Sequence, residues 1–95
     1  MGLSYIDRLR VAAQRTGHYN GQEVQWTADG ETWLDVWVGG EAPFAARVGV
    51  RRDDVEGTMW GFAYSDRDKT SSPSRLALRA EERALCAAFP ETGVS

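Results

Sequence analysis

The sequence contains one cysteine, one lysine and three prolines, and none of its apolar runs approaches the roughly 20 residues that cross a bilayer. A single cysteine, Cys86, excludes an internal disulfide and a cysteine-rich zinc site. Residues 1–5 lead directly into a charged amphipathic segment and show no signal-peptide pattern. We therefore expect a cytoplasmic protein with no membrane association.

Residues for catalysis and metal binding are equally scarce. The only histidine, His18, lies in a predicted loop and Cys86 in a predicted helix, so the sequence does not place them together. They cannot complete a tetrahedral metal site, and the acidic turns at 53–54 and 66–68 lack calcium-loop spacing. No phosphate-binding glycine motif or nucleophile motif occurs. We expect no enzymatic activity, no cofactor and no metal.

A basic surface of the kind that binds nucleic acid is also missing. The net charge is −3, and residues 21–71 carry ten acidic against five basic side chains. Residues 1–20 carry a small positive excess and residues 72–95 are balanced. Nucleic acid is therefore not the expected partner.

The apolar residues that are present suit one folded unit. Hydrophobic residues make up 42% of the 95 residues, and four of them are Trp. A chain of this length buries only roughly 60–65% of its unfolded surface, so its core needs almost every large apolar side chain. Residues 1–95 are predicted to form a single domain, in which any apolar side chain left outside the core calls for an explanation.

Capping signals predict a helix near each end of the sequence. Ser4 with Asp7 resembles a capping box and predicts a helix over 5–16. Ser72-Pro73 begins, and Pro90 ends, a helix over 73–89 with an alanine-rich stripe. Glu81 falls inside its apolar arc, so we expect this carboxylate to lie at the helix edge or to pair with an arginine.

Two runs with period-two alternation, 22–28 and 31–38, flank Asp29-Gly30 and predict a hairpin. A two-residue turn would mix apolar and acidic residues on each face. A three-residue loop, 28–30, with Gly30 in a bulge gives a consistent register instead. That register pairs Trp26 with Thr32, Val24 with Leu34 and Gln22 with Val36.

Two further strands, 44–51 and 58–65, complete the predicted sheet. The register with 31–38 places Leu34 opposite Val48, Val36 opposite Ala46, Val38 opposite Phe44, Asp35 opposite Arg47, Glu31 opposite Arg51, and Trp33 opposite Gly49. In strand 58–65 aromatic and small residues alternate. We expect Trp60, Phe62 and Tyr64 to point inward; if the small residues faced the helices, the aromatics would lie outside.

The predicted fold is α+β and two-layered, a helix, a four-stranded antiparallel meander and a helix (αββββα). Both helices cover the sheet face that contains Val24, Leu34, Val36 and Val48. The other face stays open, and it carries the two tryptophans at 33 and 37.

Exposed tryptophans beside arginines are typical of interaction surfaces. The structural alternative is a self-contained cluster in which the indoles shield glycines and stack on Arg47. We expect a small non-enzymatic protein-binding or regulatory module, whose partner is another protein or a second copy. The alternatives are single-stranded nucleic-acid binding on the same face and a purely structural homo-oligomerising domain. The predicted partner-binding residues are Trp33, Trp37, Arg47, Asp35, Arg51 and Met59.

Overall fold

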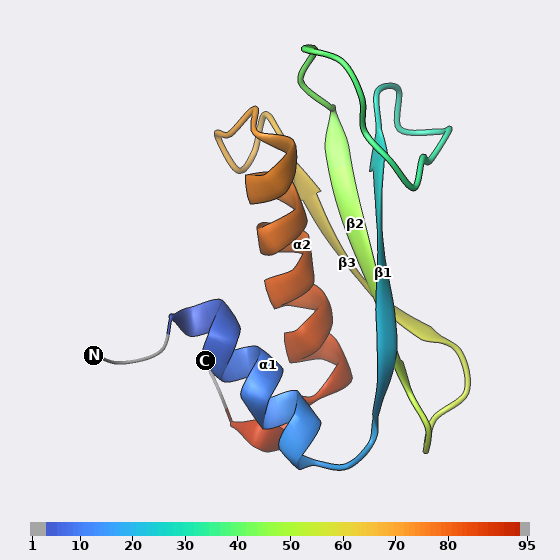
Figure 1. Cartoon of the computed structure of the whole chain (residues 1–95), viewed down its shortest axis with the longest axis vertical. Coiled ribbons are helices and arrows are strands. Elements are labelled where there is room, and N and C mark those ends of the chain that lie inside the picture. Colours follow the sequence, from blue (N-terminus) through green and yellow to red (C-terminus); the bar gives the residue numbers. More distant parts are fainter. Residues whose placement is uncertain (1–3, 94–95) are drawn as a thin grey trace.

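Two helices lie on one side of a three-stranded antiparallel sheet in the computed structural model, which describes residues 4–93 (Figure 1). The α+β class is as predicted. Residues 1–3, part of the segment that shows no signal-peptide pattern, lie outside the described range. The elements are α1 (Tyr5–Arg15), β1 (Tyr19–Thr27), β2 (Ala45–Arg52), β3 (Thr58–Tyr64), α2 (Pro73–Ala88) and the short 3-10 helix η1 (Pro90–Thr92).

Both predicted helix starts are confirmed. The Ser4 hydroxyl accepts a hydrogen bond from the Asp7 backbone N–H at 3.3 Å and donates one to the Asp7 carboxylate at 2.7 Å. Ser72 accepts from the Arg75 N–H at 3.3 Å, with Pro73 as the first helical residue. These side chains satisfy backbone donors that the first turn of a helix leaves unpaired.

The sheet has three strands in the order β1-β2-β3, so the predicted four-stranded meander is wrong. Residues 31–38 form no strand. They belong to a long connection, 28–44, which makes one isolated bridge to β1, between Leu34 and Trp26. Strand β1 pairs directly with β2 instead.

The start of the connection explains why no tight hairpin forms. The Thr27 hydroxyl accepts the N–H of Gly30, and the Asp29 carboxylate accepts those of Glu31 and Thr32 at 2.8 and 2.9 Å. Side chains thus take donors that a continuous ladder would use. Val36 and Val38 end up 66% and 82% exposed.

The strand partners predicted for 31–38 are corrected accordingly. Val24 lies opposite Val48, and Gln25 lies opposite Arg47. The new partners leave each side chain on the sheet face that was predicted for it, since Val24 still shares the inner face with Val48. The wrong pairs are Trp26 with Thr32, Val24 with Leu34, Gln22 with Val36, Val38 with Phe44, Val36 with Ala46, Leu34 with Val48, Asp35 with Arg47, Glu31 with Arg51, and Trp33 with Gly49.

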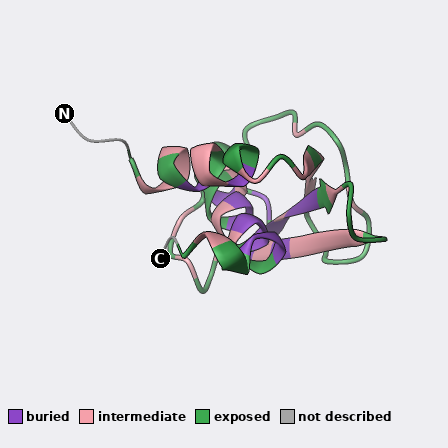
Figure 2. Cartoon of the chain, turned by 90° about the horizontal axis from the view of Figure 1, so that it is seen from below, coloured by how far each residue is buried: buried purple, intermediate pink, exposed green. Residues whose placement is uncertain are grey.

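A close contact between α2 and the sheet decides which face of β3 is buried. A Cβ on Gly61 would overlap the carbonyl oxygen of Ala80 and the backbone nitrogen of Ala84. Small side chains therefore face the helix, and the prediction that Trp60, Phe62 and Tyr64 point inward is wrong. Figure 2 shows the buried stretches on α2 and on neighbouring strands. The core comprises Leu9, Ala13, Ala46, Val48, Val50, Ala63, Leu76, Ala80, Ala84, Leu85, Ala88 and Phe89.

An ion pair closes one end of the β3 edge. Asp68 accepts the backbone N–H of Tyr64 at 2.9 Å, and Arg83 donates to the carbonyl oxygen of Phe62 at 2.7 Å. Asp68 and Arg83 also bind each other, and the guanidinium holds the pKa of Asp68 below its usual range. The pair occupies backbone groups that an incoming strand would otherwise use.

The contact at Gly61 gives a direct test. We predict that Gly61→Ala lowers the free energy of unfolding by about 2–3 kcal/mol, because the added methyl overlaps helix backbone that cannot move aside cheaply. Urea denaturation measures the change. Gly40→Ala is the matched control, since a Cβ there meets nothing within 4 Å, and it should alter stability by less than about 0.5 kcal/mol. A wild-type midpoint for Gly61→Ala would disprove the close contact.

Candidate binding face

The sheet face that points away from the helices carries aromatic side chains from β3 and an arginine from β2. The strand register places Gln25, Arg47 and Phe62 in one row across the sheet. Within residues 4–93 no helix covers this face, and the connection 28–44 reaches part of it (Figure 1). We call it the outer face and define it by Gln25, Trp33, Phe44, Arg47, Trp60, Phe62 and Tyr64.

Four aromatic rings on the outer face contact one another in sequence. Phe62 and Tyr64 stack with centroids 6.4 Å apart and planes 11° apart. Trp33 meets Phe62 edge-on at 6.0 Å, and Phe44 meets Tyr64 in the same way at 5.8 Å. Such pairs each contribute about 0.5–1.5 kcal/mol beyond the area that they bury. The rings therefore hold the loop side chains against the sheet.

Arg47 lies close to two indole rings. Its guanidinium carbon is 4.3 Å from the ring centroid of Trp33 and 4.5 Å from that of Trp60. Trp60 can reach this position because Gly49 has no side chain: a Cβ there would lie 2.9 Å from the indole. The cation is thereby stacked on aromatic surface and partly removed from water.

Hydrogen bonds fix the arginine in this position. Nε and Nη2 of Arg47 donate to the side-chain oxygen of Gln25 at 2.9 and 2.6 Å. The Gln25 amide nitrogen in turn donates to Asp35 at 2.8 Å. Asp35 thus reaches Arg47 through Gln25, where a direct cross-strand pair was predicted.

Further arginines lie towards both ends of the outer face. Arg51 makes a long ion pair of 3.5 Å with Glu23, and both side chains are more than 40% exposed. Such an exposed ion pair contributes little to the stability of the fold. Arg67 lies over the Tyr64 ring at 5.0 Å, and within the described part of the chain its guanidinium forms no ion pair. The aromatic row therefore runs between cationic groups.

Two of the predicted site residues lie elsewhere. Trp37 donates its indole N–H to the Glu41 carbonyl at 2.9 Å within the connection. Met59 lies opposite Val50 and packs against the core on the inner face. The expectation that these two residues share a surface with Trp33 depended on a strand at 31–38 and on inward aromatics in β3, and both premises are wrong.

The predicted site residues omit the aromatics of β3, whose outward orientation was only the alternative prediction. Trp60, Phe62 and Tyr64 alternate with small residues, and alternation alone does not say which set faces the helices. The signal that could have found them is the alanine stripe of α2, since a helix with small side chains can approach a strand closely where that strand is also small. Trp33, Arg47, Asp35 and Arg51 lie on or beside the outer face.

A surface cluster of His18, Asp53 and Asp54 places possible metal ligands within 4.8 Å of one another. Asp54, however, accepts two hydrogen bonds of 2.8 Å from Arg52, which lower the pKa of Asp54. His18 Nδ1 is 2.9 Å from Asp53. The adjacent guanidinium already neutralises charge that a cation would need, so we interpret the cluster as an ion-pair network.

The cysteine and the histidine lie in different parts of the structure. Cys86 on α2 is 3.3 Å from the Tyr5 hydroxyl, and this hydrogen bond raises the pKa of Tyr5. His18 follows α1 and contacts the β2–β3 turn. The structure therefore does not form the Cys–His pair that nucleophilic catalysis would need.

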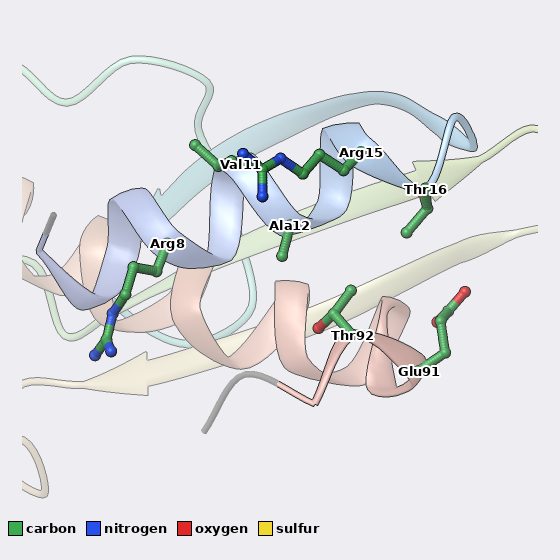
Figure 3. A pocket seen from close by; sticks show the side chains of 7 residues that line it. All are labelled: Arg8, Val11, Ala12, Arg15, Thr16, Glu91 and Thr92. Atoms are coloured by element: carbon green, nitrogen blue, oxygen red, sulfur yellow. The ribbon is translucent and has the colours of Figure 1, made fainter.

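A groove of about 530 Å³ lies between α1 and η1 (Figure 3). Ala12 faces Thr92 across it, and the guanidinium groups of Arg8 and Arg15 extend in different directions. Glu91 at its rim is bound to Arg52. A small-molecule site needs polar groups that converge on one point, and this groove lacks them.

Comparison with protein-family models, with curated proteins and with solved structures finds no match for this chain. Neither helix within residues 4–93 is long and apolar enough to cross a membrane. The functional assignment therefore depends on the chemistry of the outer face.

The buried carboxylate of α2 has a structural partner. Glu81 is 6% exposed and binds Arg10 of α1 through two hydrogen bonds of 2.7 Å. Burial acts to raise the pKa of Glu81, but hydrogen bonds from Arg10 and Gln22 outweigh it and hold this pKa below its ordinary value. The expected pairing with an arginine is confirmed, and the pair joins the two helices.

This pair makes stability depend on pH. Because the pKa of Glu81 is lower in the folded chain, its contribution is fully present above the ordinary glutamate value of about 4.3 and is lost as pH falls through the folded-state pKa. We predict that Glu81→Gln flattens the fall in unfolding free energy below about pH 4.5. Urea denaturation across that range measures it, and a slope equal to that of the wild type would contradict it.

The same pair can be broken from the other side. We predict that Arg10→Met destabilises the fold by about 3 kcal/mol at neutral pH, because it leaves a buried carboxylate unpaired. Replacing both partners, Arg10→Met with Glu81→Leu, should restore most of that loss. Glu82→Gln, one residue along α2, controls for loss of a less buried glutamate and should have a much smaller effect on unfolding. A double variant as unstable as Arg10→Met would show that the pair itself is required.

Proposed function

We propose that this protein is a small non-enzymatic binding module that recognises a protein partner through its outer face. The supporting observation is that Arg47 stacks near both Trp33 and Trp60 on a sheet face that no helix of residues 4–93 covers. The open face of an antiparallel sheet is normally polar. Tryptophan, tyrosine and arginine are the residues most enriched at the energetic centres of protein interfaces.

The contacts among side chains of the outer face favour binding. Phe62 is held between Trp33 and Tyr64, and Arg47 is fixed by Gln25. Side chains that are ordered before binding lose less conformational entropy when a partner arrives. The free energy of their contacts is then available for affinity.

Single-stranded nucleic acid also uses aromatic rings and arginines. The charge of the chain favours a protein, because residues 21–71, which include all three strands except the start of β1, carry ten acidic and five basic side chains. The excess of negative charge repels a polyanion along its whole length, whereas a peptide carries only a few charges.

A displayed library of random peptides tests the proposal. We predict that wild-type protein enriches a set of peptides, and that Phe62→Ser weakens their binding roughly 30-fold, because it removes a central ring of the outer face. Leu78→Ser is the matched control, since Leu78 is an exposed apolar residue of α2. It should leave binding unchanged. Circular dichroism and urea denaturation check that both variants are folded.

Other results would contradict the proposal. Absence of enriched peptides, or peptides that bind folded Phe62→Ser as well as wild type, would remove the outer face as a binding site. Light scattering separates a partner from a second copy: the proposal expects a monomer. A dimer that Phe62→Ser converts to monomer would assign the outer face to self-association.

A further inference from the structure

Arg47 has one side of its guanidinium free. Nε and Nη2 are used by Gln25, while Nη1 has no hydrogen bond or ion pair within residues 4–93. No buried side-chain nitrogen or oxygen in the described chain lacks a hydrogen-bond partner. Because Nη1 lacks one, it is in contact with solvent. The half-buried cation thus keeps one donor group that is unpaired within the described chain and is not fully buried.

The surroundings of this donor strengthen any bond to an anion. The ring centroids of Trp33 and Trp60 lie 4.3 and 4.5 Å from the guanidinium carbon, and the Arg47 side chain is half-buried beside them. Charge-assisted hydrogen bonds are roughly twice as strong as neutral ones, and lower local polarity strengthens them further. Arg47 is also held in place, so little side-chain freedom is lost when a ligand binds.

Resting on the proposed function, we infer that the partner supplies a carboxylate side chain to Arg47. The ligand is a peptide segment with an aspartate or glutamate flanked by apolar residues. The carboxylate accepts from Nη1, and the flanking side chains pack on the rings of Trp60 and Phe62. Arg67, over the Tyr64 ring at one end of the outer face, adds a positive charge that favours acidic segments.

A carboxylate fits this site better than the phosphates of a nucleic acid. One anchored arginine with one free nitrogen can satisfy a single small anion, whereas single-strand binding requires a groove of cations along the backbone. The ion pair of Arg51 with Glu23 also places an acidic group on this side of the sheet. An isolated carboxylate in a peptide avoids most of this repulsion.

The peptides enriched on wild-type protein provide the test. Among them, the inference expects a shared acidic residue next to apolar residues. Replacing that residue with its amide should raise the Kd for wild type roughly 10-fold, because the amide oxygen still accepts from Nη1 but no longer carries the negative charge that strengthens the bond. For Arg47→Gln the acidic and amide peptides should bind within about twofold of each other, because no charged donor is left to distinguish them. Arg15→Gln, on α1, is the control and should discriminate like wild type.

The outcomes separate this inference from the function on which it rests. If enriched peptides require Phe62 but their amide versions bind wild type equally well, the carboxylate is wrong and the binding face stands. If no peptide requires Phe62, the proposed function itself fails. Titration with oligothymidylate, followed by Trp fluorescence, should show no quenching. Steeply salt-dependent quenching that Arg47→Gln abolishes would assign Arg47 to nucleic acid and overturn the inference.

Discussion

The close approach of α2 to β3 at Gly61 determines how the rest of the molecule is arranged. Backbone atoms of Ala80 and Ala84 occupy the space that a side chain at position 61 would need. Because successive strand residues point to opposite faces, turning Gly61 and Ala63 toward the helix turns the aromatics of β3 outward. The same contact thus packs the core tightly and leaves a chain of 95 residues with large rings outside it.

Features that depend on neighbouring residues could be predicted from the sequence, whereas those that depend on a choice of partner could not. The caps at Ser4 and Ser72 act within one helical turn, and both were predictable. The predicted strand over 31–38 is wrong: this segment alternates as a strand does, yet Val24 finds an equally apolar partner in Val48 of β2. The alternation of side chains places each residue on one face of a sheet but does not say which strand lies next to it.

The candidate site was likewise predicted only in part. Trp33 and Arg47 were predicted on one surface and do lie together, although Trp33 arrives from a loop and not from a strand. Its place was right because the bridge at Leu34 keeps the predicted parity locally. Trp37 lies only four residues further on, where the chain has left the sheet. The alternation of strand side chains therefore no longer determines where this residue points.

The ion pair of Asp68 and Arg83 has a consequence for how the sheet meets other molecules. It occupies the backbone groups of Tyr64 and Phe62 at the edge of β3, while Glu23 puts a charge on β1, the other edge strand. Unpaired edge strands beside half-buried aromatic rings are a template for pairing with another chain. The closed end of β3 and the charge on β1 oppose such pairing, so the sheet can carry aromatic rings on its outer face with less risk of aggregation.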